Sequence, residues 1–193
     1  MPSHDKIKRI LELFIIRKER PVGRYALKDM LDLPEGKTRG RLARLRDEEL
    51  IEETKQGATI TEKGERELRR LLSSMSIAAI DIIDVGALKT GHESAVIHVC
   101  GRAGKIGTAE YTELRDEAVR VGAQGATIIV FGDGKLSVPA VFPDLETEYQ
   151  SIAKILLEKF DLQPGDVIVV GSALTEWKAL EGALAVASAL GKK

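Results

Sequence analysis

The stretch LPEGKTRGRLARLRDEELIEETKQGATIT, residues 33–61, decides the fold of the first part of this chain. Pro34 suits the first turn of a helix, and Leu42, Leu45 and Leu50 have the spacing of an inward apolar line. The cations of the same helix are predicted to project outward: Lys37, Arg39, Arg41, Arg44 and Arg46. The pattern therefore predicts an amphipathic helix with a strongly basic exposed face.

This charge order opposes the helix macrodipole, which favours anions at the N-terminus and cations at the C-terminus. Acidic residues lie instead near the far end, at Asp47, Glu48 and Glu49. Each misplaced exposed charge near a terminus costs about 0.3–1 kcal/mol. An anionic partner lying across the basic half explains the order, whereas a solvated charged face is the simpler alternative.

A small β wing is predicted directly after this helix. Residues 51–54 and 58–61 read as two strands, and Gly57 permits the positive φ of a tight hairpin with Lys55 at its tip. Helices are predicted over 5–20, over 24–31 and, capped by Thr61, over about 62–74. The first 74 residues therefore predict a winged helix-turn-helix domain.

Composition divides the chain at the same place. Residues 1–74 carry 18 Lys and Arg against 14 Asp and Glu, whereas residues 75–193 carry 11 against 16. A basic front half and an acidic back half indicate one domain that faces nucleic acid and one that does not. No apolar run is long enough to cross a bilayer and no signal peptide is recognisable, so we expect a cytoplasmic protein with no membrane partner.

The segment KERPVGRYALKDMLDLPEGKTRGRLARLRDEELIEE, residues 18–53, resembles the winged helix of HrcA-type heat-shock repressors. The likeness lies in the Pro-Val-Gly turn, the Ala-Leu pair and the Leu-x-x-Leu then Leu-Ile close. It implies DNA contacts at Lys37, Thr38, Arg39, Arg41 and Arg44, with Arg24 as a weaker candidate. The rest of the chain does not resemble the repressor, so heat-shock control is not implied.

In a DNA complex this helix would enter the major groove and the wing would touch the backbone or the minor groove. Thr38 and Arg39, near the N-terminal end of the helix, are the candidates for reading base edges. Phosphate contacts are expected from Lys37, Arg41, Arg44 and Lys55. A winged helix used for protein contact is the alternative, because fold does not dictate function.

The second domain, residues 75–193, predicts an α+β fold. Strands are expected over 77–86, 94–100, 126–131, 136–141 and 166–170, and helices over 108–121, 147–160 and 174–190. The order ββαββα plus βα predicts a two-layer α/β sandwich, with helices on one face of a mainly antiparallel sheet. Without its first strand the order is ferredoxin-like, so that topology and a GAD-like or DCoH-like sandwich both remain open.

The whole chain also resembles an uncharacterised archaeal family in which a winged helix precedes a GAD-like domain of unknown function. The likeness rests on the HrcA-like front and on residues 96–111, VIHVCGRAGKIGTAEY, and 125–146, GATIIVFGDGKLSVPAVFPDLE. This family implies no activity.

One loop of the second domain has the composition of an anion site. A strand opens into a glycine-rich loop and then a helix, which can aim backbone N–H groups and side chains at an anion. The candidate residues are Gly101, Arg102, Gly104, Lys105 and Thr108. The loop is not a P-loop, and 171–173 repeats its pattern of strand, small-residue loop and helix. A small anionic effector is one hypothesis, and glycines that merely permit turns are the other.

Catalytic and metal-binding signals are weak. His98 and Cys100 can share one face of a strand, but two ligands are too few for zinc and a third would have to come from His92. Cys100 is the only cysteine and has no recognisable acid–base motif around it. We therefore expect no catalytic residue, no metal and no cofactor.

The leading hypothesis from the sequence is a DNA-binding transcriptional regulator that acts as a homodimer on double-stranded DNA. Its second domain would serve dimerisation, effector sensing or both. The alternatives are an enzyme or small-molecule-binding protein that uses the winged helix for docking, and an RNA-binding or translation-associated protein.

Overall fold

The computed structural model describes residues 3–106 and 110–191. The chain divides into two compact units, Met1–Ser74 and Met75–Lys193, at the boundary that composition and patterning indicate. Each unit is described by itself. None of the described helices is long and apolar enough to cross a membrane.

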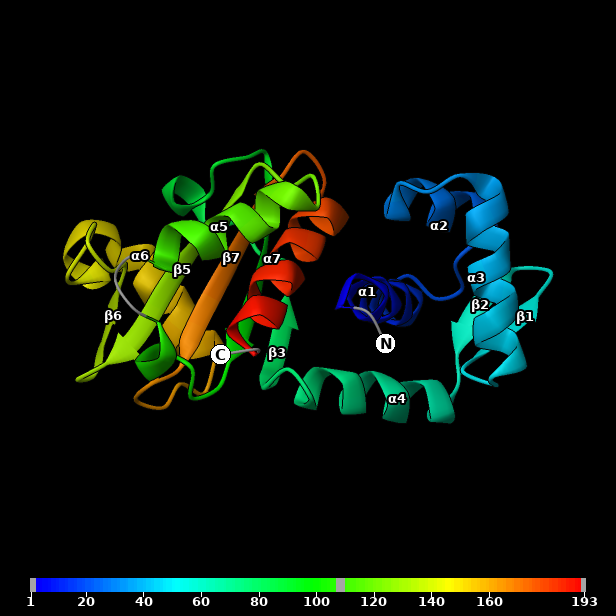
Figure 1. The fold of residues 1–193 in the computed structure, drawn as a ribbon, viewed down its shortest axis with the longest axis horizontal. Coiled ribbons are helices and arrows are strands. Elements are labelled where there is room, and N and C mark those ends of the chain that lie inside the picture. The colour runs from blue at the N-terminus through cyan, green and yellow to red at the C-terminus, as the bar shows by residue number, and fades with distance from the viewer. Residues whose placement is uncertain (1–2, 107–109, 192–193) are drawn as a thin grey trace. The chain divides into compact units, whose positions relative to one another are not determined.

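The first unit is a winged helix (Figure 1). Its elements are α1 (Ser3–Lys18), α2 (Arg24–Leu31), α3 (Glu35–Asp47), β1 (Ile51–Thr54), β2 (Gly57–Ile60) and α4 (Glu62–Ser73). The strands pair antiparallel, with Ile51 opposite Ile60. Thr61 caps α4 by accepting a hydrogen bond of 3.0 Å from the Gly64 amide. The predicted winged-helix fold is therefore confirmed.

Gly57 closes the turn of the wing, opposite Thr54. Its φ is +137°, a backbone conformation that side chains rarely adopt, and a Cβ there would lie 2.6 Å from the Val22 carbonyl carbon. Val22 also bridges to Ala58, with N–O distances of 3.0 and 2.8 Å in the two directions. The hairpin therefore needs glycine for two reasons, its dihedral angle and the close approach of a third segment.

The second unit is built on a five-stranded antiparallel sheet with strand order β3-β4-β7-β5-β6. The strands are β3 (Ile77–Asp81), β4 (Glu93–Val99), β5 (Gly125–Gly132), β6 (Lys135–Ser137) and β7 (Val167–Ala173). The helices are α5 (Glu110–Arg120), α6 (Leu145–Lys159) and α7 (Glu176–Leu190), with short 3₁₀ turns at η1 (Gly86–Leu88) and η2 (Ala103–Lys105). The predicted α+β class and the predicted order of elements are confirmed.

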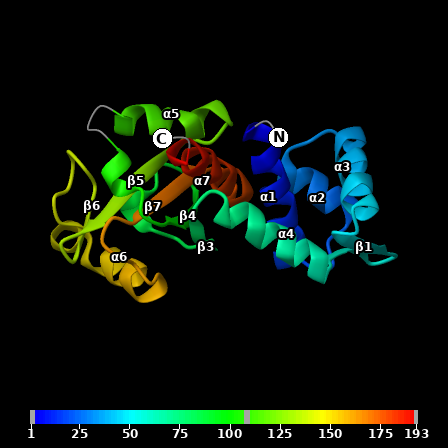
Figure 2. The same ribbon diagram turned by 60° about the horizontal axis from the view of Figure 1, so that its bottom comes forward.

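The helices lie on both faces of this sheet, whereas we expected them on one face. Figure 2 shows α5 and α7 on one side and α6 on the other. On β7, Ile168 and Val170 pack in the α6 cluster, whereas a Cβ on Gly171 would lie 2.0 Å from the Ala179 carbonyl oxygen of α7. A strand that is covered on both faces has apolar residues throughout. The continuous VIVVGSA run of β7 therefore indicates that helices cover both faces of the sheet.

The strand connections form two interlocked units. β4 and β5 are joined through α5, and β7 pairs antiparallel between them. β6 and β7 are joined through α6, and β5 pairs antiparallel between them. Each is therefore a split βαβ unit, with its helix on the opposite face from that of the other.

Residues 171–173 do not form the second small-residue loop that the sequence predicts. All three belong to β7 and are buried. The Ser172 hydroxyl accepts a hydrogen bond of 3.1 Å from the Thr90 amide. Gly171 instead lets α7 pack directly on the sheet, so this part of the anion-site prediction is wrong.

Candidate nucleic-acid interface

The inward face of α3 holds the helix in its unit. Leu42 and Leu45 are buried, as the spacing predicts, and so is Thr38, whose exposed fraction is 0%. The Thr38 hydroxyl lies 3.3 Å from the Pro34 carbonyl oxygen, to which it donates. Its burial contradicts the prediction that it reads a base edge, because a short, fully buried side chain does not reach a groove.

The outward face of α3 has a ridge of small residues with basic rows on both sides. At 100° per residue, Gly36, Gly40 and Ala43 follow one line along the helix. A Cβ on Gly36 or Gly40 would meet no atom within 4 Å, so neither glycine is required by packing within the protein. Lys37 and Arg44 lie on one side of this ridge, and Arg39 and Arg46 lie on the other.

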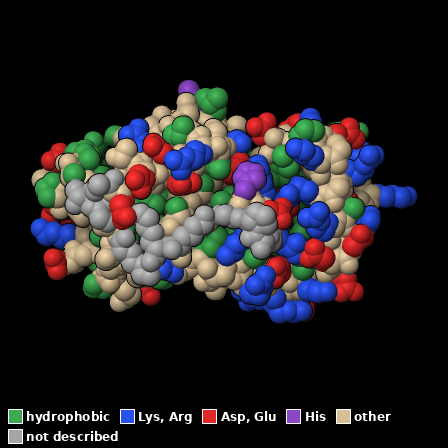
Figure 3. All heavy atoms as spheres, viewed as in Figure 1, with side chains coloured by type: hydrophobic (Ala, Val, Ile, Leu, Met, Phe, Trp, Pro, Cys, Tyr) green, Lys and Arg blue, Asp and Glu red, His purple; other side chains and the backbone are tan. Residues whose placement is uncertain are grey.

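Four of the predicted DNA contacts are exposed cations that are available to a partner. They are Lys37, Arg39 and Arg44 on α3 and Lys55 at the tip of the wing. None of the four forms an ion pair within residues 3–106 and 110–191. Figure 3 shows Lys and Arg side chains gathered over the unit that contains them, with acidic side chains between. No internal ion pair would therefore have to break before these cations bind an anionic ligand.

Arg41 has a different role from the one predicted. It pairs with Glu12 on α1, and its Nη1 donates to Asp5 Oδ1 at 3.1 Å. Glu12 is only 2% exposed, and this burial raises its pKa despite the pairing with Arg41. Arg41 therefore fastens α3 to α1, and its engagement there speaks against a phosphate contact.

Arg24 is half-buried and Arg46 is exposed, and both are already paired with acids. Arg24 lies 3.2 Å from Glu35, and Arg46 lies 3.2 Å from Glu53 on the wing. Together with the small ridge of α3 they line a groove of about 650 Å³. Phosphates in this groove would compete with Glu35 and Glu53, so both arginines are weaker candidates for DNA contacts than the four unpaired cations.

In the glycine-rich loop of the second unit, the Gly101 amide and the Arg102 side chain donate hydrogen bonds to other residues of the protein. The Gly101 amide donates to Asp166 Oδ1 at 2.8 Å, and Arg102 Nη2 donates to the Ser76 hydroxyl at 2.8 Å. Gly104 lies in the turn η2, whereas Thr108 and the Lys105 side chain lie outside the described part of the chain. Gly101 and Arg102 are therefore committed to internal contacts and not to an anion.

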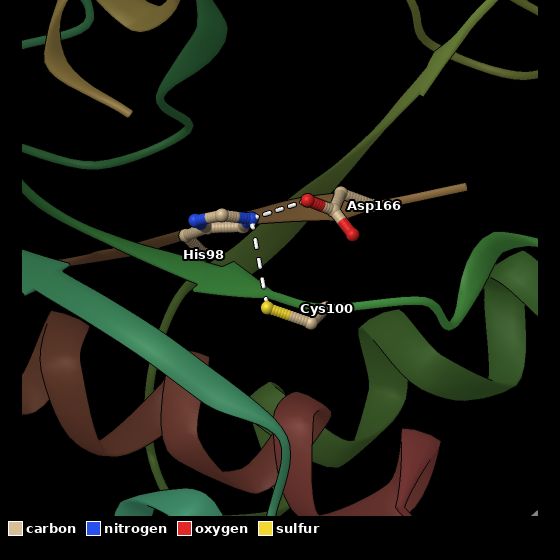
Figure 4. A group of neighbouring side chains, drawn as sticks. All are labelled: His98, Cys100 and Asp166. Atoms are coloured by element: carbon tan, nitrogen blue, oxygen red, sulfur yellow. Dashed lines mark hydrogen bonds and ion pairs between the residues drawn. The ribbon is translucent and has the colours of Figure 1, made fainter. Parts of the chain in front are cut away.

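His98, Cys100 and Asp166 form the second cluster of chemically active side chains (Figure 4). Their ligand atoms lie within 4.8 Å of one another, a grouping of three that occurs once in the described residues. His98 Nε2 lies 2.7 Å from Asp166 Oδ2, and Cys100 Sγ lies 4.0 Å from the same nitrogen. The third donor is therefore Asp166, and not His92 as the sequence suggested.

This geometry does not activate Cys100 as a nucleophile. A catalytic histidine uses one nitrogen toward the acid and the other toward the nucleophile, whereas here Asp166 and Cys100 both face Nε2. Partial burial and then the Asp166 carboxylate raise the pKa of the Cys100 thiol, which favours the unreactive protonated form.

A metal ion in this cluster would compete with bonds that already exist. The Asp166 oxygens accept from the Gln163 amide at 2.9 Å, from the Gly101 amide and from His98. Burial disfavours the charged form of Asp166, but these three hydrogen bonds hold its pKa below the usual value. We therefore interpret Asp166 as a clamp that joins the end of β4 to the start of β7.

Replacing Asp166 with asparagine is expected to destabilise the second unit by about 1–3 kcal/mol, because asparagine keeps one acceptor oxygen and the donors at the other oxygen lose their partner. Since the pKa of Asp166 is lowered on folding, its stabilisation is present above the ordinary pKa of aspartate and is lost as the pH falls through the folded value. Urea unfolding at neutral and acidic pH, followed by the fluorescence of the single tryptophan, Trp177 on α7, measures both effects.

The matched control for this experiment is Asp116→Asn, which removes an exposed carboxylate of α5. Its stability should stay within about 0.5 kcal/mol of the wild type. Equal stability of the two variants at neutral pH would contradict the clamp.

Comparison with known proteins finds a separate match for each unit. Residues 90–190, just over half of the chain, match the model of a family described as domain of unknown function (DUF4443). The chain belongs to this family. Residues 7–75 match a second model, described as the CggR N-terminal DNA binding domain, whereas the sequence alone suggested HrcA-type repressors.

A solved structure extends the likeness to both units of this DUF4443 protein. The hypothetical protein PH0730 from Pyrococcus horikoshii OT3 is 28% identical, with 96% of this chain and 92% of that chain covered and a TM-score of 0.75. No curated protein matches the chain. The comparisons thus place a DNA-binding type of domain at the front and leave the role of the second unit open.

Proposed function

We propose that this protein is a sequence-specific transcriptional regulator that contacts double-stranded DNA through the exposed face of α3 and the wing. One observation carries the proposal. Unpaired cations lie on both sides of the ridge of α3, where Gly36 and Gly40 place no side chain between the backbone and a partner. A glycine inside a helix costs about 0.5–1 kcal/mol relative to alanine, and nothing inside the protein requires it here.

We assign different roles to the four unpaired cations. Arg39 lies beside the ridge near the N-terminal end of α3, where recognition helices read base edges. A bidentate contact between an arginine and guanine discriminates by about 1–3 kcal/mol. Lys37, Arg44 and Lys55 are assigned to phosphates, which hold the helix in register and make binding depend on salt.

The second unit is proposed to be non-catalytic and to support a homodimer. A single winged helix reads few base pairs, whereas a symmetric dimer reads two half-sites about 34–36 Å apart. The Cys100 geometry supports a role without nucleophilic chemistry, because the thiol and the Asp166 carboxylate both face the same nitrogen of His98.

Salt-dependent binding to duplex DNA tests the proposal. Wild-type protein should bind random duplex at low salt, with log K falling linearly against log salt at a slope of about −0.9 per phosphate contacted. Transfer RNA in the same competition distinguishes RNA recognition. No binding at low salt, or a preference for transfer RNA over duplex DNA, would overturn the proposed function.

A further inference from the structure

A pocket of about 380 Å³ lies in the second unit beside the outer edge of β5. The register with β6 runs only from Val130 to Gly132, so β6 leaves the earlier part of β5 uncovered on that side. The pocket borders Ala126, Thr127 and Ile128 there. Its other walls come from α5, from the turn η1 and from residues 138–142.

The lining combines an apolar base with one cation at the rim. Leu88, Ile128 and Val138 contribute buried apolar side chains. Arg115 of α5 lines the same pocket and forms no ion pair within residues 3–106 and 110–191. Small-molecule sites have this composition, with apolar walls and a few polar groups that fix the orientation of the ligand.

Arg115 lies close to the start of β5. A Cβ on Gly125 would lie 3.6 Å from Arg115 Nε and 2.9 Å from the Thr90 hydroxyl. Only the Thr90 distance is shorter than an ordinary contact, so Thr90 is the neighbour that requires glycine here. The guanidinium lies at contact distance from the start of β5 and lines the pocket. The positive charge of Arg115 therefore borders the pocket as well as solvent.

The loop over residues 138–142 forms one wall of the pocket and contains a strained residue. Val138 and Phe142 exchange two hydrogen bonds of 2.8 Å, and Ala140 between them has a φ of +62°. Val141 is left 60% exposed at the rim. Non-glycine residues with positive φ are costly and cluster at ligand sites, so the strain is an observation independent of the pocket's composition.

We propose that this pocket binds a small carboxylic acid, with the carboxylate at Arg115 and an apolar body against Leu88, Ile128 and Val138. A planar guanidinium matches a carboxylate through two parallel hydrogen bonds. A phosphate monoester is a poorer match, since a dianion would meet one cation in a half of the chain that carries 11 Lys and Arg against 16 Asp and Glu. The inference concerns the second unit and does not rest on DNA binding by α3.

Binding of a model acid to the full-length protein tests the proposal. The probe is 3-phenylpropanoate, and 3-phenylpropanamide has nearly the same shape without the charge. Backbone amide shifts in ¹⁵N NMR spectra locate the site and give the affinity. The variants are Arg115→Gln and, as a matched control on the same helix, Arg120→Gln, whose side chain pairs with Glu117.

The expected result is that the acid shifts the amides of 126–128 and 140–142 and binds about tenfold or more tightly than the amide. Arg115→Gln should remove this preference, and Arg120→Gln should keep it. Equal affinity for acid and amide in the wild type would overturn the proposal. So would a preference that survives in Arg115→Gln, tighter binding of phenyl phosphate, or shifts confined to residues outside the pocket.

Discussion

Replacing Lys37, Arg44 and Lys55 together with alanine is expected to lower the affinity for random duplex DNA by about one hundred to one thousandfold at about 0.1 M salt. The slope of log K against log salt should flatten by about 2.7 units, because three phosphate contacts are lost. The three side chains are exposed and unpaired within the described residues, so the fold should not change. Fluorescence anisotropy of a labelled duplex measures both quantities.

The matched control removes three lysines from the second unit: Lys135, Lys154 and Lys159. It changes the net charge of the protein by the same amount, but its affinity for DNA and its salt slope should stay close to the wild type. Equal losses in the two triple variants would show that overall charge, and not α3 with the wing, governs binding. Arg41 is left out because its removal would strand the buried Glu12.

Replacing Gly40 with leucine is expected to change stability and DNA binding in opposite directions. The first unit should become more stable by about 0.5–1 kcal/mol, because a helix former replaces an exposed helical glycine that touches nothing. Affinity for duplex DNA should fall by about tenfold or more, since the new side chain keeps the ridge of α3 away from the groove. Thermal unfolding and anisotropy measure the two effects on the same preparation.

Gln150→Leu on α6 is the control, because it adds an exposed leucine at unchanged charge in the second unit. It should leave DNA affinity unaltered. A Gly40→Leu variant that binds DNA as tightly as the wild type would contradict the close approach of α3. Loss of stability in that variant would show that Gly40 serves the fold instead.

Local patterns predicted the elements well because their signals lie within short windows. The spacing of apolar residues predicted α1 and α3, and the turn at Gly57 predicted the wing. The alternation of strand and helix patterns predicted the order of elements in the second unit. The predicted roles of single residues failed where contacts between segments far apart in the sequence determine them. Arg41 meets Glu12 across 29 positions, and His98 meets Asp166 across 68.

Some missed features nevertheless left a signal in the sequence. Small residues at 36, 40 and 43 have the spacing of one helical face, which marks the ridge between the basic rows. Thr38 falls on the same face as Leu42 and Leu45, so its burial follows from the periodicity. The pocket beside β5 left no comparable signal, because it depends on where β6 stops pairing.

The central claim is that α3 and the wing lie on duplex DNA, and NMR mapping of the full-length protein with a short duplex tests it most directly. The amides of Gly36 and Gly40, the rest of α3 and the wing tip around Lys55 should shift on titration, whereas the amides of the sheet in the second unit should not. Shifts confined to the second unit or to the α1 and α4 helices, with α3 unaffected, would contradict the claim.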